Sequence, residues 1–204
     1  PNDHTAGTRP GMPTPRAMIA ENDQALGRLV EAISKSRFWK ESAIFVLEDD
    51  AQNGADHIDA HRSVLLMASP YARRGALDPT MYTTSGVLRT IELILGLEPL
   101  SQYDAAATPM YAAFRSKPDV RPFTALPPRV PLDEKNRPDA WGAEESVRMN
   151  LEEADRAPDL LLNEIVWRSV RGADQPMPAP MRASWVRPIE IDEADDDDDT
   201  AESP

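Results

Sequence analysis

The sequence contains no cysteine among its 204 residues. Disulfide bonds, thiolate metal sites and a cysteine nucleophile are therefore excluded. This absence is compatible with an oxidising compartment but does not establish one. Long apolar segments are missing as well. No run approaches the roughly 20 apolar residues that a helix needs to cross a bilayer, so we expect no membrane span.

A basic surface is also missing. The formal net charge is −13, and nine of the 35 acidic residues lie from Glu190 onward, where there is no basic residue. The rest of the chain holds 26 acidic and 22 basic residues, a net charge of −4. Nucleic-acid binding requires clustered Lys and Arg. We therefore expect no nucleic-acid-binding surface.

The chain begins at Pro1 rather than at methionine, and no apolar signal-peptide core follows it. We expect a processed or truncated part of a longer protein, with any targeting signal outside it. Its length allows one ordinary domain with a substantial core.

The most informative stretch runs from Ala43 to His61, AIFVLEDDAQNGADHIDAH. Its first five residues are apolar and favour a buried strand, which ends at three consecutive carboxylates, Glu48-Asp49-Asp50. The loop after the strand carries four further residues with oxygen or nitrogen ligands: Asp56, His57, Asp59 and His61. In open α/β sheets, ligands bind in the crevice at the carboxyl ends of strands.

Carboxylates and imidazoles gathered in this way predict a divalent metal site, for Zn²⁺ or Mn²⁺ ahead of Ca²⁺ or Mg²⁺. The third histidine, His4, follows Asp3 in a loop rich in proline and glycine. The predicted ligands are Asp49, Asp50, His61, His57, His4 and Asp3. The alternative is a solvated acidic loop whose histidines pair with neighbouring carboxylates, and an Asx-type turn at Asp3-His4.

Apolar spacing predicts a helix over residues 16–35 that packs onto a sheet. Its inner face is expected to hold Ile19, Leu26, Val30 and Ile33. A second apolar run over residues 64–68 predicts another strand, and both runs are typical of strands covered on two faces. The connection of about sixteen residues between the strands is too long for a tight hairpin and fits a functional loop.

A further helix is expected from Gly86 to Leu95, with Ser85 as its cap and Gly96 as its end. Its inner face should hold Val87, Leu88, Ile91 and Leu95. A short helical turn is expected after Pro109.

From Lys117 onward proline becomes frequent, which predicts an extended strap over a domain surface. Helical patterns follow over residues 139–150 and 158–170, the second with Gly172 just past its end. The predicted divisions are therefore 1–116, 117–189 and an acidic, disordered tail at 190–204.

Four segments together resemble the bacterial phosphoesterase family, which includes phospholipases C and acid phosphatase A within the alkaline phosphatase superfamily. These segments are PNDHTAGT, ALGRLVEAISKSRFWKESAIFVLEDDAQNGADHIDAHRS, SPYARRG and LRTIELILGLEPLSQYD. The chain most resembles large bacterial members in which a β-propeller precedes the phosphoesterase domain. The similarity covers Pro1 to Phe114, and Pro122–Ala183 is similar to the C-terminal extension of that subgroup.

The resemblance implies an α/β fold with an alkaline-phosphatase-like central mixed β-sheet flanked by helices, present here as a partial domain. It also implies one or two divalent metals. Asp49-Asp50 stands where relatives place a metal-binding Asp-Glu or Asp-His pair, and Asp56-His57-Ile58 is similar to their Asp-His-Val. His61 is a further candidate ligand. Asn2-Asp3-His4 is similar to an upstream element, but Asp and His are adjacent here, which leaves open which of them binds metal.

The family also uses a Ser or Thr nucleophile that lies upstream of the segment matching Pro1. The hydroxyl residues of this chain lie in segments unlike that of the nucleophile. We therefore expect the chain to be the C-terminal part of the enzyme and to be inactive alone. Its implied partners are a phosphate-ester substrate, the β-propeller and the N-terminal half of the phosphoesterase domain.

The expected activity is hydrolysis of a phosphomonoester or phosphodiester, in the periplasm, at the outer surface or outside the cell. Two alternatives remain open: a non-catalytic scaffold that keeps the fold, and a sulfatase-like or phosphonate hydrolase activity. Arg62, Arg73 and Arg74 are candidates for a phosphate contact, although surface arginines usually have no such role.

Overall fold

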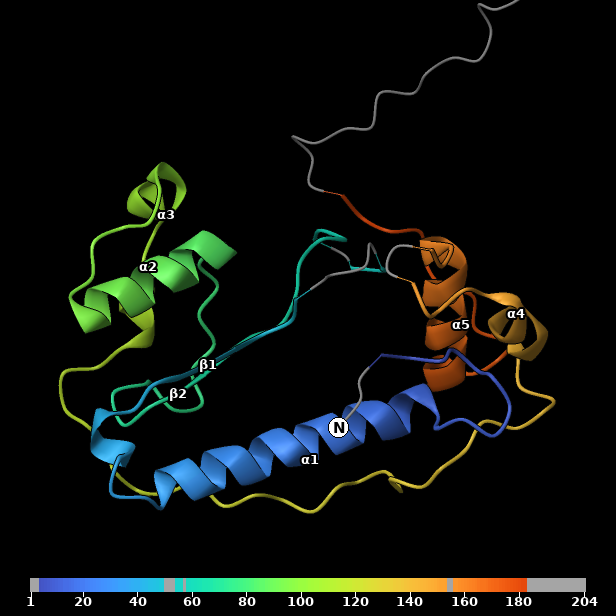
Figure 1. Ribbon diagram of the computed structural model, residues 1–204, viewed down its shortest axis with the longest axis horizontal. Coiled ribbons are helices and arrows are strands. Elements are labelled where there is room, and N and C mark those ends of the chain that lie inside the picture. Colours follow the sequence, from blue (N-terminus) through green and yellow to red (C-terminus); the bar gives the residue numbers. More distant parts are fainter. Residues whose placement is uncertain (1–3, 50–53, 57, 154–155, 183–204) are drawn as a thin grey trace, which may run out of the picture.

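The structure is a computed structural model that describes residues 4–49, 54–56, 58–153 and 156–182. Within these residues the chain forms helices and one small sheet (Figure 1). The elements in chain order are α1 (Pro15–Ser34), the 3₁₀ helix η1 (Trp39–Glu41), β1 (Ile44–Leu47), β2 (Leu65–Ala68), α2 (Thr84–Leu95), α3 (Gln102–Ala106), the 3₁₀ helix η2 (Tyr111–Ala113), α4 (Ala143–Arg148) and α5 (Asp159–Arg171).

The sheet consists of β1 and β2, which pair antiparallel with Ile44 opposite Ala68 and Leu47 opposite Leu65. Both predicted strands are confirmed to within one residue. The fold is broadly α/β, with helices and a two-stranded antiparallel sheet. Because this sheet is so small, the larger alkaline-phosphatase-like sheet stays a prediction.

Helix α1 begins one residue before the predicted start. Thr14 caps it by accepting a hydrogen bond from the Ala17 N–H at 3.2 Å, and Pro15 occupies the first turn, where a missing N–H costs nothing. The buried side of the helix includes Ala17 and Met18. Ile19 was predicted on the inner face but is 62% exposed, so that assignment is wrong.

The helix packs against α5, and Figure 1 shows it running from the α4–α5 end of the molecule to the sheet end. Residues 114–142, which contain no helix or strand, return along α1. Phe123 donates its backbone N–H to the Ser34 hydroxyl at 2.9 Å, and the Ala125 N–H donates to the Glu31 carboxylate at 3.2 Å. These bonds tie the returning segment to the C-terminal half of the helix.

Helix α2 is capped by Thr83, whose hydroxyl accepts from the Gly86 N–H at 3.2 Å, so the prediction of Ser85 as the cap is wrong. Its predicted end is confirmed, since Gly96 adopts the left-handed conformation with φ of 68°. The predicted inner face is only partly correct. Val87 is buried, but Leu88 and Leu95 are exposed because the buried stripe passes through Thr90 instead.

Thr90 can be buried because its hydroxyl both donates and accepts a hydrogen bond. It donates to the Gly86 carbonyl at 2.7 Å and accepts from the Met110 N–H at 2.9 Å. The turn that leads into η2 is thereby held against α2. The predicted helical turn after Pro109 corresponds to η2.

The main buried apolar cluster lies at the other end of the molecule, where Met149, Leu162 and Ile165 pack together. Two of these residues belong to α5, which begins at Asp159 and ends before Gly172, in line with the prediction for residues 158–170. Helix α4 is shorter than the predicted 139–150.

No described helix is long and apolar enough to cross a membrane. The predicted acidic tail at 190–204 lies outside the described residues, and the predicted division at residue 117 stays a prediction.

Candidate metal site

The predicted site begins where the sheet ends. Glu48 donates its N–H to the Val64 carbonyl at 3.3 Å, which extends the β1–β2 ladder by one residue. Asp49 follows directly, and both acidic side chains are exposed. Because β1 ends at Leu47, the Asp49 carboxylate lies beyond the sheet and is exposed. Asp50, its predicted partner, lies outside the described residues.

Asp56 stabilises the part of the loop that leads into β2. One carboxylate oxygen accepts the N–H groups of Ile58 and Asp59, at 2.7 and 3.1 Å. The other accepts two bonds from the Arg62 guanidinium, at 3.1 and 2.9 Å. The Ile58 N–H bond, helped by Asp59 and Arg62, lowers the pKa of Asp56 to about 2. Asp56 therefore holds the loop, and Arg62 is engaged with it rather than free for a phosphate.

His61 is exposed and is oriented by Asp59. Its ring Nδ1 lies 2.9 Å from the Asp59 Oδ1, which also accepts the His61 backbone N–H at 2.8 Å. Its Nε2 lies 3.2 Å from the Arg182 Nη1. Since arginine only donates, both contacts are satisfied by the tautomer with the proton on Nδ1 and the lone pair on Nε2. That tautomer is the one a metal would need at Nε2.

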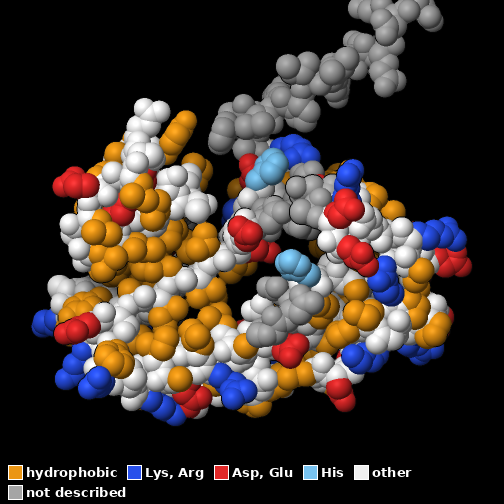
Figure 2. All heavy atoms as spheres, viewed as in Figure 1, with side chains coloured by type: hydrophobic (Ala, Val, Ile, Leu, Met, Phe, Trp, Pro, Cys, Tyr) orange, Lys and Arg blue, Asp and Glu red, His pale blue; other side chains and the backbone are white. Residues whose placement is uncertain are grey.

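The three predicted ligands that the structure describes are not gathered at one point. In the described ranges, no group of three or more His, Asp or Glu side chains could hold a metal ion. His4 lies apart, beside Met149 and Leu151 in a depression of about 300 Å³. Figure 2 shows the two described histidines, in pale blue, as separate groups. The other three predicted ligands, Asp3, Asp50 and His57, fall outside the described residues.

The remaining candidates for a phosphate contact are also engaged. Arg73 donates to the Phe114 carbonyl at 2.9 Å, and Arg74 lies 3.5 Å from the Asp119 carboxylate and over the Phe123 ring. Both arginines thus fasten the segment after η2 to the turn after β2. All three candidate arginines are thus engaged with groups of the protein itself.

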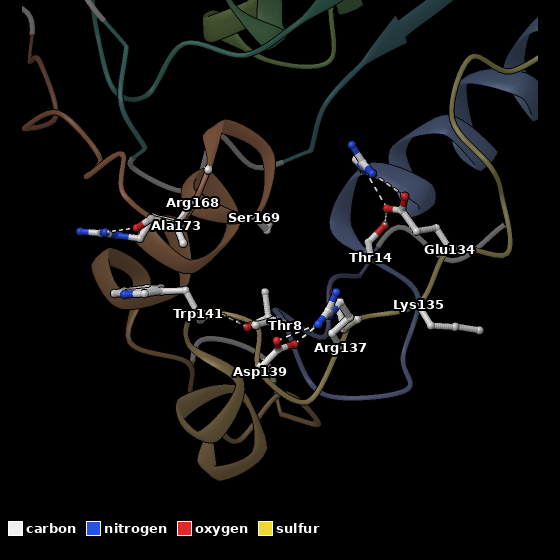
Figure 3. Close-up of a pocket in the computed structure, with 14 residues that line it drawn as sticks. Thr8, Thr14, Glu134, Lys135, Arg137, Asp139, Trp141, Arg168, Ser169 and Ala173 are labelled. Carbon is white, nitrogen blue, oxygen red and sulfur yellow. Dashed lines mark hydrogen bonds and ion pairs between the residues drawn. The ribbon is translucent and has the colours of Figure 1, made fainter.

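A larger cavity, of about 510 Å³, lies where the N-terminal loop, the segment before α4 and the end of α5 meet (Figure 3). It was not anticipated from the sequence. Arg16 contacts the Glu134 carboxylate through two nitrogens, at 2.7 and 2.5 Å. The Arg16 bond, together with one from Thr14, lowers the pKa of Glu134 to about 2.

The other two arginines of this cavity also contact protein groups. Arg137 binds Asp139 through two bonds of 2.8 Å, and the Arg168 guanidinium lies 4.4 Å from the centre of the Trp141 ring. The buried Thr8 hydroxyl donates to the Trp141 carbonyl at 2.8 Å. These contacts hold three segments together. Because its three arginines are engaged with protein groups, we regard the cavity as a structural junction.

No sequence pattern pointed to the Arg182 contact with His61 or to the junction, because the partners are more than 100 residues apart. The Asp59–His61 contact is of the kind that the alternative of a solvated acidic loop predicts, a histidine paired with a neighbouring carboxylate. No protein-family model, no curated protein and no solved structure matches this chain.

Proposed function

We propose that this chain is the C-terminal part of a metal-dependent phosphoesterase that hydrolyses phosphomonoesters or phosphodiesters. Asp49, Asp50, His57 and His61 would hold a Zn²⁺ or Mn²⁺ ion, with Asp3 or His4 contributing from the N-terminal loop. The Ser or Thr nucleophile would come from the upstream part of the polypeptide, so the chain alone would be inactive.

The observation that carries the proposal is the Asp59–His61 pair. The Asp59 carboxylate lies 2.9 Å from Nδ1 and leaves Nε2 as the acceptor of the ring. Histidines that bind metals usually donate their second ring N–H to a carboxylate or carbonyl in this way, which fixes the tautomer and the ring orientation. The same arrangement would suit His61 as a metal ligand, with the metal replacing the Arg182 contact at Nε2.

The acidic residues after β1 supply negative charge that would balance a bound metal cation. Adjacent carboxylates such as Glu48 and Asp49 repel one another, and a bound cation removes that repulsion. When bound, a divalent ion would neutralise the phosphate oxygens and activate the nucleophilic hydroxyl. Asp49 and His61 would hold it in place, and Asp59 would keep the His61 ring turned toward it.

The same proposal includes two implied partners, the β-propeller and the N-terminal half of the domain. It also includes a location in the periplasm, at the outer surface or outside the cell. So does the alternative that a sulfate ester or phosphonate is the substrate. A scaffold without activity is favoured by one observation. Among the described residues, no group of three or more His, Asp or Glu side chains could hold a metal ion.

Metal content and turnover of the complete polypeptide test the proposal. The Asp49→Asn/Asp50→Asn variant is compared with Glu144→Gln/Glu145→Gln, which removes the same charge from two exposed residues of α4. Metal is measured by mass spectrometry after dialysis against Zn²⁺ or Mn²⁺. Turnover is measured with p-nitrophenyl phosphate and bis-p-nitrophenyl phosphate.

We expect stoichiometric metal and hydrolysis in the wild type and in the α4 variant, and loss of both in the Asp49/Asp50 variant. A wild type that takes up no metal even after supplementation contradicts the proposal. Metal uptake without turnover of any ester in the panel, including a sulfate ester, would support the scaffold.

A further inference from the structure

The chain continues past the end of α5 as an extended segment. A turn comes first, in which the Gln175 N–H donates to the Gly172 carbonyl at 3.0 Å. Residues 176–182, which we call the C-terminal arm, then have proline at every second position from Pro176 to Pro180. Proline fixes φ near the value of an extended polyproline helix, so the arm is semi-rigid and spans about 3 Å per residue.

The arm ends on the loop between the two strands. The Ala60 N–H donates to the Met181 carbonyl at 2.5 Å, and Ala60 is buried. The next residue of each segment also takes part, since the Arg182 Nη1 lies 3.2 Å from the His61 Nε2. Two hydrogen bonds from consecutive residues therefore join the arm to the loop that carries the predicted metal ligands.

The Arg182 bond uses the nitrogen that a metal ion would need. The Asp59 carboxylate, 2.9 Å from Nδ1, favours the ring proton on that nitrogen, which leaves a single lone pair on Nε2. An arginine only donates hydrogen bonds and stays charged in proteins. His61 can therefore give its lone pair to the guanidinium of Arg182 or to a metal ion, but not to both.

Charge acts in the same direction as this competition. A guanidinium within a few ångströms of a divalent cation is repelled by it, and water at an exposed site weakens the repulsion without removing it. Arg182 must therefore leave His61 when the ring binds a metal ion. The arm then keeps only the Ala60–Met181 bond of the two bonds described above, which weakens its attachment to the loop.

We propose that the C-terminal arm is a latch on the metal loop: Arg182 competes with metal for His61, and the arm leaves the loop when His61 binds metal. The latch rests on the proposed function, because that function makes His61 a ligand. Coupling of this kind is reciprocal. The factor by which the latch weakens metal binding equals the factor by which bound metal weakens the latch.

Metal affinity and hydrogen exchange, both measured on the complete polypeptide, test the latch. Affinity for Zn²⁺ and Mn²⁺ is measured by isothermal titration calorimetry for the wild type, Arg182→Ala and Arg129→Ala. Arg129 is exposed on the segment that returns along α1, so its replacement removes the same charge far from the loop. Exchange of the Ala60 amide, with and without metal, reports on the bond to Met181.

We expect Arg182→Ala to bind metal about three- to fivefold more tightly than the wild type, the range for an exposed charged contact. Arg129→Ala should bind metal as the wild type does. The Ala60 amide should be protected in the metal-free wild type and exchange faster with saturating metal. In Arg182→Ala it should exchange faster even without metal.

Two results would overturn the latch and leave the proposed function standing. One is equal metal affinity of the wild type and Arg182→Ala. The other is an Ala60 amide that stays equally protected when the wild type is saturated with metal. A wild type that takes up no metal at all overturns the proposed function and the latch together.

Discussion

At the scale of single residues, the loop between the strands is shaped by its own carboxylates. Asp56 binds two backbone N–H groups and one guanidinium, and Asp59 binds the backbone and the ring of His61. Short polar side chains commonly satisfy nearby backbone donors in this way. The two aspartates therefore fix the loop, and they leave Nε2 of His61, which lies 3.2 Å from Arg182, as the acceptor of the ring.

Asp56 leads to a prediction about pH. Its pKa is about 2 in the folded loop, below the ordinary value of 3.8, because its ionised form accepts these bonds. Because the pKa of Asp56 is lowered, its ionised carboxylate stabilises the loop at pH values above the ordinary pKa. That stabilisation is lost as the pH falls toward 2. The amides of Ile58 and Asp59 should therefore lose protection from hydrogen exchange between about pH 4 and 2, after correction for intrinsic rates.

The Asp56→Ala variant should show no protection at these two amides at any pH. Asp174→Ala, at an exposed position after α5, should behave like the wild type. Protection that persists unchanged to pH 2 would show that the Asp56 carboxylate does not hold the turn.

At the scale of elements, the helices were easier to predict than their first residues. Apolar spacing predicted α1, α2 and α5, because each helix buries one side. The cap of α2 was ambiguous because Thr83, Thr84 and Ser85 are three successive residues able to cap. Only the backbone path decides which hydroxyl reaches a free N–H, and it selects Thr83.

Replacing the two candidate caps tests this assignment. Thr83→Ala should lower the free energy of unfolding by about 1 kcal/mol, because it leaves the Gly86 N–H without its capping oxygen. Ser85→Ala should change it by less than about 0.5 kcal/mol. Urea unfolding of both variants measures the difference. A larger loss for Ser85→Ala would mean that the helix begins later.

At the scale of the whole molecule, the α4–α5 end depends on a close approach that only glycine allows. Gly142 has φ of 76°, and a Cβ atom there would lie 2.5 Å from the Ile165 Cγ1. Ile165 is fully buried in the main apolar cluster, so it has no space to move. Gly142 thus sets how closely the turn before α4 approaches α5.

Gly142→Ala should therefore be strongly destabilising. Backbone strain of about 1 kcal/mol adds to a steric cost of about 1–3 kcal/mol in the core. Gly11→Ala is the matched control, because Gly11 has a similar φ of 78° but nothing within 4 Å of its Cβ position. It should cost about 1 kcal/mol. Equal losses in urea unfolding would show that contact with Ile165 contributes nothing.

Sequence alone determined the features that depend on neighbours along the chain. Periodic apolar residues gave the positions of the main helices and of both strands, and Gly96 gave the end of α2. The composition of the loop between the strands identified Asp49 and His61 as candidate ligands. These signals are local, because helix faces, strand composition and turn residues act over a few positions.

Only the tertiary structure decided which distant groups meet. Ile19 is exposed on α1, and Leu88 and Leu95 are exposed on α2, since the packing of each helix selects its buried side and periodicity does not. The ion pair of Arg16 with Glu134 and the contact of Arg182 with His61 join residues more than 100 positions apart. Such contacts depend on how distant segments of the chain pack together in the fold, and no short-range sequence pattern predicts that packing.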